Sequence, residues 1–514
     1  MNTAKQLKQS ISLLQIVEGL VTIQDADSSS LDVIVSGVQM DSRLLQQGDL
    51  FIACFGRNHD ARDFINEAVD MGAAAVLAEA SDDWVGVKYI ENVPVLAVDN
   101  LFSKISEIAS RFYSHPSQKL NVIGITGTNG KTSCCQFIAQ ALNSMNLQCG
   151  TIGTLGYGVY GALKETQLTT PDAVFTQKAL AEMAEEGIDP VVMEVSSVGL
   201  HQRRVKAVHF DTAVFTNLSR DHLDYHESME DYGKNKKKLF QSKGLRQAVV
   251  NLDDPYALSV INSIPKCVEI STYSINNKIA SVYAEEVNMT RKGFEARIST
   301  PIGEGNIEGS LLGYFNFSNL LAVITTLISY LSKQDDLNIE KLCSEVSAIK
   351  PVDGRMEIIS GSDDITAVVD YAHTPDGLRS ALLGLRDHFD GDIWCVFGCG
   401  GNRDKGKRPL MGEVAEQYAN KLLITDDNPR NETGDKIVQH ILSGIVDPQK
   451  AQVIRDRAEA ISYAIANAKS GDVVLVAGKG HETYQDIEGT KLIFSDANQV
   501  RLALQARNGR STKG

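Results

Sequence analysis

The stretch from Val122 to Ser133, VIGITGTNGKTS, contains the residue types of a phosphate-binding loop. Its glycines let backbone N–H groups turn toward phosphate oxygens, Lys131 adds a positive charge, and Thr132 offers a hydroxyl to Mg²⁺. The spacing departs from the usual P-loop, because five residues rather than four separate Gly124 from Gly130. An ordinary strand-to-helix turn is the alternative reading. Because strand, turn, lysine, hydroxyl and helix follow in order, we expect nucleotide contacts from Gly127, Thr128, Asn129, Gly130, Lys131 and Thr132.

Two later stretches carry side chains that can bind a metal. VVMEVSS places Glu194 inside an apolar run, where a lone carboxylate is costly unless it is paired or bound to a cation. TNLSRDHLDYH places His222 among carboxylates at the end of another apolar run. A buried structural glutamate and a surface histidine are the alternatives. Downstream of a phosphate-binding loop, the two together favour a Mg²⁺ site.

A lysine-rich stretch, EDYGKNKKKLF, contains four lysines, and a solvated helix face is the ordinary explanation. Helical spacing separates them, because Tyr232, Lys236, Leu239 and Phe240 recur at i, i+4, i+7 and i+8 and so share one face. Only Lys236 therefore lies on the apolar face. Burial there lowers the pKa of an ammonium group and makes the amine reactive.

Predicted strands and helices alternate along the chain, and they must position these residues. The chain has 514 residues, a length that suits two to four domains. Short apolar runs rich in β-branched residues end in polar or glycine-rich loops, as in buried parallel sheets that bind ligands beyond their carboxyl ends. Connections near 111–120 and 348–357 predict domains at 1–105, 106–349 and 350–514.

Composition restricts the class of protein. A net charge of −15 argues against a broad nucleic-acid surface. Residues 1–12 do not resemble a secretory signal, and the apolar stretch near Leu320 predicts a packed helix rather than a membrane span. Eight scattered cysteines match no zinc or disulfide pattern. We expect a cytoplasmic protein that binds neither membrane nor nucleic acid.

The motifs, taken together and in order, resemble those of the Mur ligases along nearly the whole chain. They are GITGTNGKTS, MEVSS, NLSRDHLDYH, GYFNFSN, GRME, VDYAHTPD, FGCGGNRDKGKRP, TDDNPRNE and AGKGHETYQ. The resemblance implies an α/β, three-domain architecture. The N-terminal domain would bind a UDP-N-acetylmuramoyl group, a central P-loop ATPase-like parallel sheet would bind ATP, and a Rossmann-like C-terminal domain would bind an amino acid.

The resemblance also implies the reaction, which is an ATP-dependent amide ligation in peptidoglycan precursor synthesis. ATP would phosphorylate the glutamyl carboxylate of UDP-N-acetylmuramoyl-L-alanyl-D-glutamate, and the amine of meso-diaminopimelate would attack the acyl phosphate. Mg²⁺ would be held by Thr132, Glu194, His222 and Lys236, the lysine carrying a CO₂-derived carbamate (N6-carboxylysine). Lys131 would complete the catalytic set, and the enzyme is expected to be a monomer.

The remaining site residues are also implied by the resemblance. The further ATP contacts are Asn316, Asn319, Arg355 and Asp370. For the two asparagines a helix-cap or turn role is a rival explanation. The contacts with the UDP-sugar dipeptide are Ser42, Asn58, His59, Asp60, Thr169, Thr170, Ser196, Gln202 and Arg204. A helix N-terminus alone would also explain Thr169 to Pro171.

The stretch TDDNPR predicts the amino-acid pocket. The turn at Asn428 and Pro429 holds Arg430, whose guanidinium can grip a carboxylate in a bidentate fork, as can that of Arg403. Diaminopimelate has a distal carboxylate that lysine lacks. An arginine would attract this carboxylate and repel the distal ammonium of lysine. Glu482 would accept the distal ammonium. The full predicted set is Arg403, Asp427, Asn428, Pro429, Arg430, Gly478 and Glu482, and the alternative is a solvated surface arginine.

Three positions depart from the family's usual pattern: Val198 replaces a common histidine, Ala61 a glycine, and Gly434 a proline. None of them lies in the phosphate loop. The rival functions are a lysine-adding ligase, a folylpolyglutamate synthetase-like ligase, and a nucleotide-binding regulatory module without turnover. The SGVQMDSR and DNPR stretches argue against the second rival, and the intact Lys131 and Lys236 argue against the third.

Overall fold

The computed structural model describes residues 10–21, 31–56, 60–166, 168–332, 337–361 and 364–511. The chain divides into two compact units. The first comprises Met1–Gly124, Leu147–Ala213 and Lys238–Arg246, and the second comprises Ile125–Asn146, Val214–Lys237 and Gln247–Gly514. Strands β8 (Val122–Thr126) and β12 (Thr212–Phe215) contain residues of both units.

The N-terminal part of the first unit is built around a five-stranded sheet of order β3-β4-β5-β7-β6, parallel except for β6. Alternation along β4 sends Leu50 and Ile52 into one hydrophobic cluster and Phe51 and Ala53 into another, so both faces of the sheet are covered. The elements are β1 (Ile11–Ser12), α1 (Leu13–Val17), β2 (Ile34–Val35), β3 (Gly37–Gln39), β4 (Asp49–Ala53), α2 (Ile65–Asp70), β5 (Ala75–Glu79), β6 (Val87–Ile90), β7 (Val93–Val98) and α3 (Ile105–Phe112).

The rest of the first unit contributes strands to a second, mixed sheet. Strand β11 pairs parallel with β9, and β10 closes the edge as an antiparallel hairpin partner of β9. Helix α5 begins after Asp172, whose carboxylate accepts a hydrogen bond from Phe175 N and caps the helix. The elements are β9 (Gly150–Gly153), β10 (Gly156–Val159), α5 (Ala173–Glu185), β11 (Val191–Glu194) and α6 (Ser197–His201).

The second unit contains a further set of paired strands. Strands β13, β14 and β15 are parallel, whereas β16 and β17 continue as an antiparallel meander. The predicted parallel sheet is therefore confirmed, with antiparallel strands added at its edges. The elements are α4 (Lys131–Ser144), α7 (Met229–Lys237), β13 (Gln247–Asn251), α8 (Ala257–Ile261), β14 (Glu269–Ser274), β15 (Val282–Thr290), β16 (Gly293–Thr300), β17 (Gly303–Gly309), α9 (Tyr314–Leu331) and α10 (Ile339–Ser347).

Helix α9 contains the longest apolar stretch. By length and composition it is the one helix among the described residues that could cross a membrane, but 72% of its apolar window is buried inside the folded chain. The core helix of a soluble protein has the same properties, so the prediction of a packed helix near Leu320 is confirmed.

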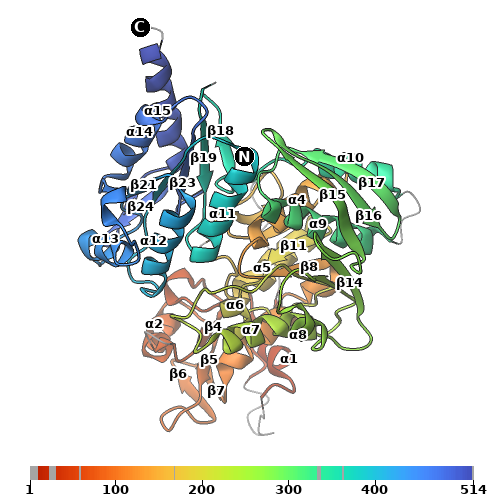
Figure 1. Cartoon of the computed structure of the whole chain (residues 1–514). Coiled ribbons are helices and arrows are strands. Elements are labelled where there is room, and N and C mark those ends of the chain that lie inside the picture. The colour runs from red at the N-terminus through yellow and green to blue at the C-terminus, as the bar shows by residue number, and fades with distance from the viewer. Residues whose placement is uncertain are drawn as a thin grey trace. The chain divides into compact units, whose positions relative to one another are not determined.

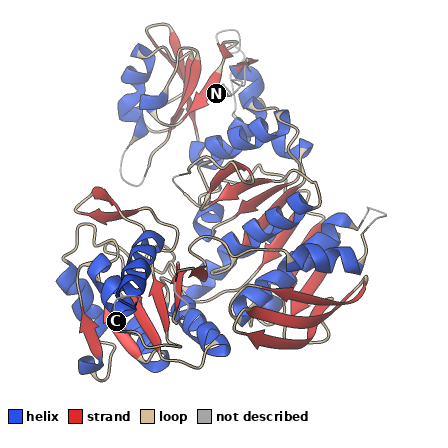
Figure 2. Ribbon diagram, turned by 90° about the horizontal axis from the view of Figure 1, so that it is seen from above, coloured by secondary structure: helices blue, strands red, loops and turns tan. Residues whose placement is uncertain are grey.

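The C-terminal part of the second unit is a doubly wound sheet of order β18-β19-β23-β20-β21-β22, parallel except for β18. Alternate residues of β23 enter two cores: Val473 and Leu475 face α11–α13, and Val474 and Val476 face α14 and α15. Helices accordingly cover both faces of the sheet (Figures 1 and 2). The elements are β18 (Glu357–Ile359), β19 (Thr366–Asp370), α11 (Pro375–His388), β20 (Ile393–Phe397), α12 (Lys407–Tyr418), β21 (Lys421–Ile424), α13 (Gly434–Leu442), β22 (Ala451–Val453), α14 (Arg457–Asn467), β23 (Val473–Ala477), β24 (Tyr484–Ile487), β25 (Thr490–Ile493) and α15 (Asp496–Ser511).

Candidate functional site

The glycine-rich loop has the strand–loop–helix form that the sequence predicts. Strand β8 ends at Thr126 and α4 begins at Lys131, with Gly130 at the N-cap in a left-handed conformation, φ +86°. A side chain at Gly127 would collide with Thr216 Oγ1, 1.8 Å from the position of an added Cβ. Lys131 Nζ donates to the carbonyl oxygens of Gly127 (2.8 Å) and Thr128 (2.9 Å). The loop thus presents the start of a helix, where backbone N–H groups favour an anion.

Lys236 lies on the buried face of α7, as its helical position predicts. It is 1% exposed, whereas Lys234 and Lys238 are exposed. Its Nζ donates to Gly127 O (2.7 Å) and lies 4.3 Å from the centre of the Tyr232 ring. Burial, reinforced by the positive charge of Lys131, holds the pKa of the Lys236 ammonium well below its usual value. A neutral amine is therefore favoured beside the phosphate loop.

An acidic residue that the sequence reading did not select, Asp221, lies beside these lysines. It is 9% exposed, and its carboxylate lies 3.4 Å from His222 Nε2. Burial raises the pKa of Asp221, but the opposing charges of His222, His373 and Lys407 bring it down to about 2. The predicted metal ligand His222 therefore belongs to a cluster of ionisable groups that includes its neighbour Asp221 and two residues from a distant part of the sequence, His373 and Lys407.

Arg355 and Asp370 also lie near the loop. Arg355 Nη2 donates to Thr132 Oγ1 (3.2 Å), and its guanidinium stacks on the Tyr371 ring at 4.3 Å. The carboxylate of Asp370 accepts from the backbone of Met356 (2.7 Å) and Ala372 (2.8 Å). Within the second unit, Arg355 therefore contacts the P-loop threonine. Asp370 holds the backbone that follows Arg355 and the backbone that follows Tyr371.

Asn316 and Asn319 are not helix caps, so the rival explanation for them is wrong. Both lie inside α9, whose N-cap is Gly313, and both are buried. Asn316 Nδ2 donates to Leu312 O (3.0 Å), and Asn319 Nδ2 donates to Asn316 Oδ1 (3.3 Å). Cys134 Sγ of α4 lies 3.5 Å from Asn319 Oδ1, so the asparagine pair sits against the first turn of the P-loop helix.

In the first unit, five of the predicted dipeptide-binding residues form one network with Glu194. Glu194 is 1% exposed and accepts hydrogen bonds from Thr154 N (2.8 Å) and Thr154 Oγ1 (3.2 Å). Thr154 Oγ1 is 3.0 Å from Thr169 Oγ1, and Thr170 Oγ1 donates to Glu194 O (3.0 Å). The carboxylate is thus held by hydrogen bonds at the end of β11.

The same network extends through the loop after β11. Ser196 N donates to Thr170 Oγ1 (2.9 Å), and Ser196 Oγ caps α6 by accepting from Gly199 N (3.1 Å). Arg204 donates to Thr170 O (2.6 Å) and through Nε and Nη2 to Gln202 Oε1 (2.9 and 2.6 Å). Five of the predicted dipeptide contacts, which come from the segments 169–170 and 196–204, therefore form one polar cluster with Thr154 and Glu194.

The remaining predicted dipeptide contacts lie in the N-terminal part of the first unit. Ser42 is buried at the start of the 3₁₀ helix Ser42–Leu44. Asp60 forms a bidentate ion pair with Arg62, and the hydrogen bond from this arginine lowers the pKa of the carboxyl. Asn58 and His59 lie outside the described residues.

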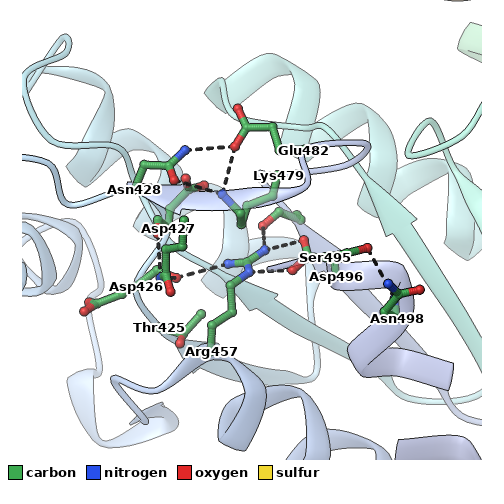
Figure 3. A network of polar contacts seen from close by, with 12 residues as sticks. Thr425, Asp426, Asp427, Asn428, Arg457, Lys479, Glu482, Ser495, Asp496 and Asn498 are labelled. Carbon is green, nitrogen blue, oxygen red and sulfur yellow. Dashed lines mark hydrogen bonds and ion pairs between the residues drawn. The ribbon is translucent and has the colours of Figure 1, made fainter. Parts of the chain in front are cut away.

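The residues predicted to bind the amino acid lie mainly in loops that follow β21 and β23. Asn428 Nδ2 donates to Glu482 Oε2 (2.8 Å), which joins the DNPR turn to the GKGHE loop (Figure 3). Gly478, φ +119°, lies against Asp427, whose Oδ2 is 2.5 Å from the position of an added Cβ. The sequence reading missed Lys479, which is fully buried between Asn428 and Glu482.

Arg430 and Arg403 occupy neighbouring loops. Arg430 adopts a left-handed conformation, φ +52°, and its Nη1 donates to Gly401 O (2.9 Å). Its Nε lies 3.9 Å from Asp486 Oδ2, and its side chain is 23% exposed. Arg403 Nη1 donates to Asn402 O (3.0 Å). Arg430 is therefore packed into the loop structure rather than extended into solvent.

The side chains predicted to bind a metal ion are of several chemical types. Within the described ranges, no group of three or more His, Cys, Asp or Glu side chains is arranged to hold a metal. The predicted ligand set differs from such a group because it includes a hydroxyl and a carbamate besides Glu194 and His222. Oxygen ligands of this kind suit Mg²⁺.

Three models of protein families match the chain. The description "Mur ligase family, catalytic domain" matches residues 34–113, "Mur ligase middle domain" matches 125–327, and "Mur ligase, glutamate ligase domain" matches 354–480. Among curated relatives, the UDP-N-acetylmuramoyl-L-alanyl-D-glutamate–2,6-diaminopimelate ligase of Coxiella burnetii is 47% identical over 94% of this chain and 99% of its own. The protein of the same name from Pseudomonas aeruginosa is 46% identical over 92% and 96%.

Solved structures give a consistent result. A structure of a UDP-N-acetylmuramoyl-L-alanyl-D-glutamate–2,6-diaminopimelate ligase is 35% identical, with a TM-score of 0.68 over 97% of this chain and 99% of that one. The MurF ligase of Thermotoga maritima, solved in complex with ADP, is 16% identical, with a TM-score of 0.61 over 92% and 98%. The second likeness concerns the fold alone.

Proposed function

The chain belongs to the Mur ligase family, and from that premise we propose that it joins meso-2,6-diaminopimelate to UDP-N-acetylmuramoyl-L-alanyl-D-glutamate at the cost of ATP. The observation that carries the proposal is the 47% identity with a ligase of that name over 94% of this chain. The protein is an ADP-forming ligase of peptidoglycan precursor synthesis. We assign the UDP-N-acetylmuramoyl group to the domain of residues 1–105, ATP to the domain of residues 106–349 together with Arg355 and Asp370, and the amino acid to the domain of residues 350–514, in a monomeric cytoplasmic enzyme.

The reaction starts from a carboxylate, which is a poor acyl donor because its leaving group would be oxide. Transfer of the γ-phosphoryl group of ATP to the glutamyl carboxylate creates a better leaving group. The helix N-terminus after Gly130 and the ammonium of Lys131 are placed to hold the phosphates. On binding ATP, Lys131 exchanges the carbonyl oxygens of Gly127 and Thr128 for phosphate oxygens.

The side-chain types of the predicted ligands suit Mg²⁺. Thr132 supplies a hydroxyl at the first turn of α4, and Glu194 supplies a carboxylate already held in one orientation by Thr154. His222 supplies an imidazole beside Asp221. When bound, Mg²⁺ would neutralise charge that develops on the transferred phosphoryl group.

Lys236 is assigned to the carbamate. Carbon dioxide adds only to a neutral amine, and the lowered pKa of the buried Lys236 provides one. The amine lies 2.7 Å from Gly127 O, so a carboxyl group added there would lie beside the phosphate loop. Carbamylation would also give this side chain a negatively charged group that can bind a metal.

The pocket chemistry favours diaminopimelate over lysine. Arg430 uses Nη1 to bind Gly401 O, and no described residue accepts a hydrogen bond from its Nη2. A carboxylate at the distal end of the amino acid would satisfy this group, whereas the bare ammonium of lysine would face a like charge. Glu482 is placed to accept the distal ammonium. Asp427, Asn428, Pro429, Gly478 and Arg403 complete the proposed contacts.

Oxygen transfer tests the proposed acyl phosphate. With both oxygens of the glutamyl carboxylate labelled by ¹⁸O, one label becomes the bridging oxygen of the acyl phosphate and leaves with phosphate when the amine attacks. Mass spectrometry should find one ¹⁸O in the inorganic phosphate and one in the amide of the product. Unlabelled phosphate accompanied by product would refute carboxylate activation. The Lys131→Ala variant, expected to lose product formation, is the control for enzymatic transfer.

A further inference from the structure

The lysine that follows Gly478 is buried in the proposed amino-acid pocket. Lys479 is 0% exposed. Its Nζ donates to Asn428 Oδ1 (2.9 Å) and to Glu482 Oε2 (2.8 Å), as Figure 3 shows. A buried ammonium is costly unless charge and hydrogen bonds compensate it. Both compensating partners belong to the proposed pocket, so the position of Lys479 is tied to the pocket's geometry.

The hydrogen bonds around Lys479 leave one carboxylate oxygen for a ligand. Asn428 Oδ1 accepts from both Lys479 Nζ and Asp486 N (2.9 Å), while Asn428 Nδ2 donates to Glu482 Oε2. Lys479 and Asn428 therefore converge on the same oxygen of Glu482. No described residue donates to the other oxygen, Oε1, and the side chain is 19% exposed. Oε1 is thus oriented by the lysine and accessible to a ligand ammonium.

The charge of Lys479 also changes what the pocket attracts. The ammonium of Lys479 pairs with the carboxylate of Glu482, so the two side chains together carry no net charge. A ligand group that carries both an ammonium and a carboxylate matches Glu482 together with Arg430. A ligand with a lone ammonium gains less from a carboxylate that is already paired.

We propose that Lys479 is a positioning residue that sets the amino-acid specificity, by orienting Glu482 and cancelling its charge so that a zwitterionic end group is preferred to a lone ammonium. The inference rests on the proposed function. Lys479 acts through Asn428 and Glu482 and does not itself contact the substrate.

The test compares Lys479→Met with Lys491→Met. Both lysines lie near the Tyr484 ring, at 5.7 Å for Lys479 and 4.3 Å for Lys491, but Lys491 is exposed on β25 and has no contact with Asn428 or Glu482 among the described residues. Phosphate release gives KM for meso-diaminopimelate and the inhibition constant of L-lysine as a competitor. In Lys479→Met we expect KM to rise at least threefold and the inhibition constant to fall at least threefold. In Lys491→Met neither should change.

A purely structural role would give a different pattern. Loosening of the pocket weakens both ligands together, so a rise of both constants, or no change in either, would overturn the inference. The same opposite shifts in Lys491→Met would overturn it as well. If Lys479→Met does not fold, Lys479→Gln, which keeps a donor but no charge, is measured in its place. A wild-type enzyme without diaminopimelate-dependent release would instead refute the proposed function itself.

Discussion

A fully buried ion pair holds together the strand ends that carry the amino-acid loops. Arg457 and Asp496 form two hydrogen bonds of 2.7 Å, and both side chains are 0% exposed (Figure 3). Arg457 Nη2 also donates to Ala477 O (2.9 Å), the last residue of β23 before the GKGHE loop. Substitution of Arg457 by Met would leave the carboxylate of Asp496 buried without a counter-charge. Removing one partner of such a pair costs about 3–5 kcal/mol.

The double variant separates charge from packing. Replacing both members of a buried pair by apolar residues is often neutral or stabilising, although Ala477 O would lose a donor at a cost of about 1–3 kcal/mol. We therefore expect Arg457→Met with Asp496→Leu to be at least about 2 kcal/mol more stable than Arg457→Met alone. Arg501→Met, which breaks a 3.5 Å contact of a half-exposed arginine with Glu357, should cost less than about 1 kcal/mol.

Denaturant unfolding followed by tryptophan fluorescence measures these differences. The chain has two tryptophans, and Trp394 lies in β20 within the hydrophobic cluster that α14 and α15 cover. In a Trp84→Phe background, the signal reports on the C-terminal sheet. A cost below about 1 kcal/mol for Arg457→Met, or a double variant no more stable than the single one, would refute the assignment of the stability to the buried charge pair.

Three further predictions concern the role of Lys236, the carbamate and the pH dependence of folding stability. Lys236→Met should lower kcat at least about 100-fold while the melting temperature is kept or raised, because a polar amine is removed from a buried position; a loss below tenfold in steady-state assays would contradict the carbamate role. Removing CO₂ and bicarbonate should lower wild-type activity reversibly, with no effect on the residual activity of Lys236→Met. Burial lowers the folded-state pKa values of His373 and His481 to about 4. The stability that these neutral histidines contribute is therefore complete above pH 6.5 and is lost as pH falls from 6.5 to 4. The loss is up to about 1.4 kcal/mol per pH unit for each histidine. Denaturation midpoints of His373→Gln and His481→Gln should therefore depend less steeply on pH in this range than those of the wild type.

Local patterns in the sequence predicted the elements well. The phosphate loop and the burial of Lys236 follow from residue spacing within one short segment, which is why the structure reproduces both. The strands IWCVF and VVLVA were also readable, since continuous apolar runs are typical of strands buried on both faces. Short-range periodicity carries this information without knowledge of the tertiary fold.

Contacts between distant segments could not be predicted from spacing. Asp221 and His373 are 152 positions apart, and only the folded chain shows that they share one charged cluster. Lys479 lies in a quoted motif, but a lysine between glycines has no local signal of burial, so its role was missed. Asn316 and Asn319 are polar residues at the start of a helix, which suggested caps, whereas the actual N-cap is Gly313.

Phosphate release with MgATP and UDP-N-acetylmuramoyl-L-alanyl-D-glutamate, in the presence of either meso-diaminopimelate or L-lysine, tests the central claim most directly. We predict release with diaminopimelate and not with lysine, and loss of the diaminopimelate-dependent rate in Arg430→Ala. Release with lysine instead would keep the ligase reaction but contradict the assigned specificity. No release with either amino acid would contradict the assignment of this chain as an active ligase.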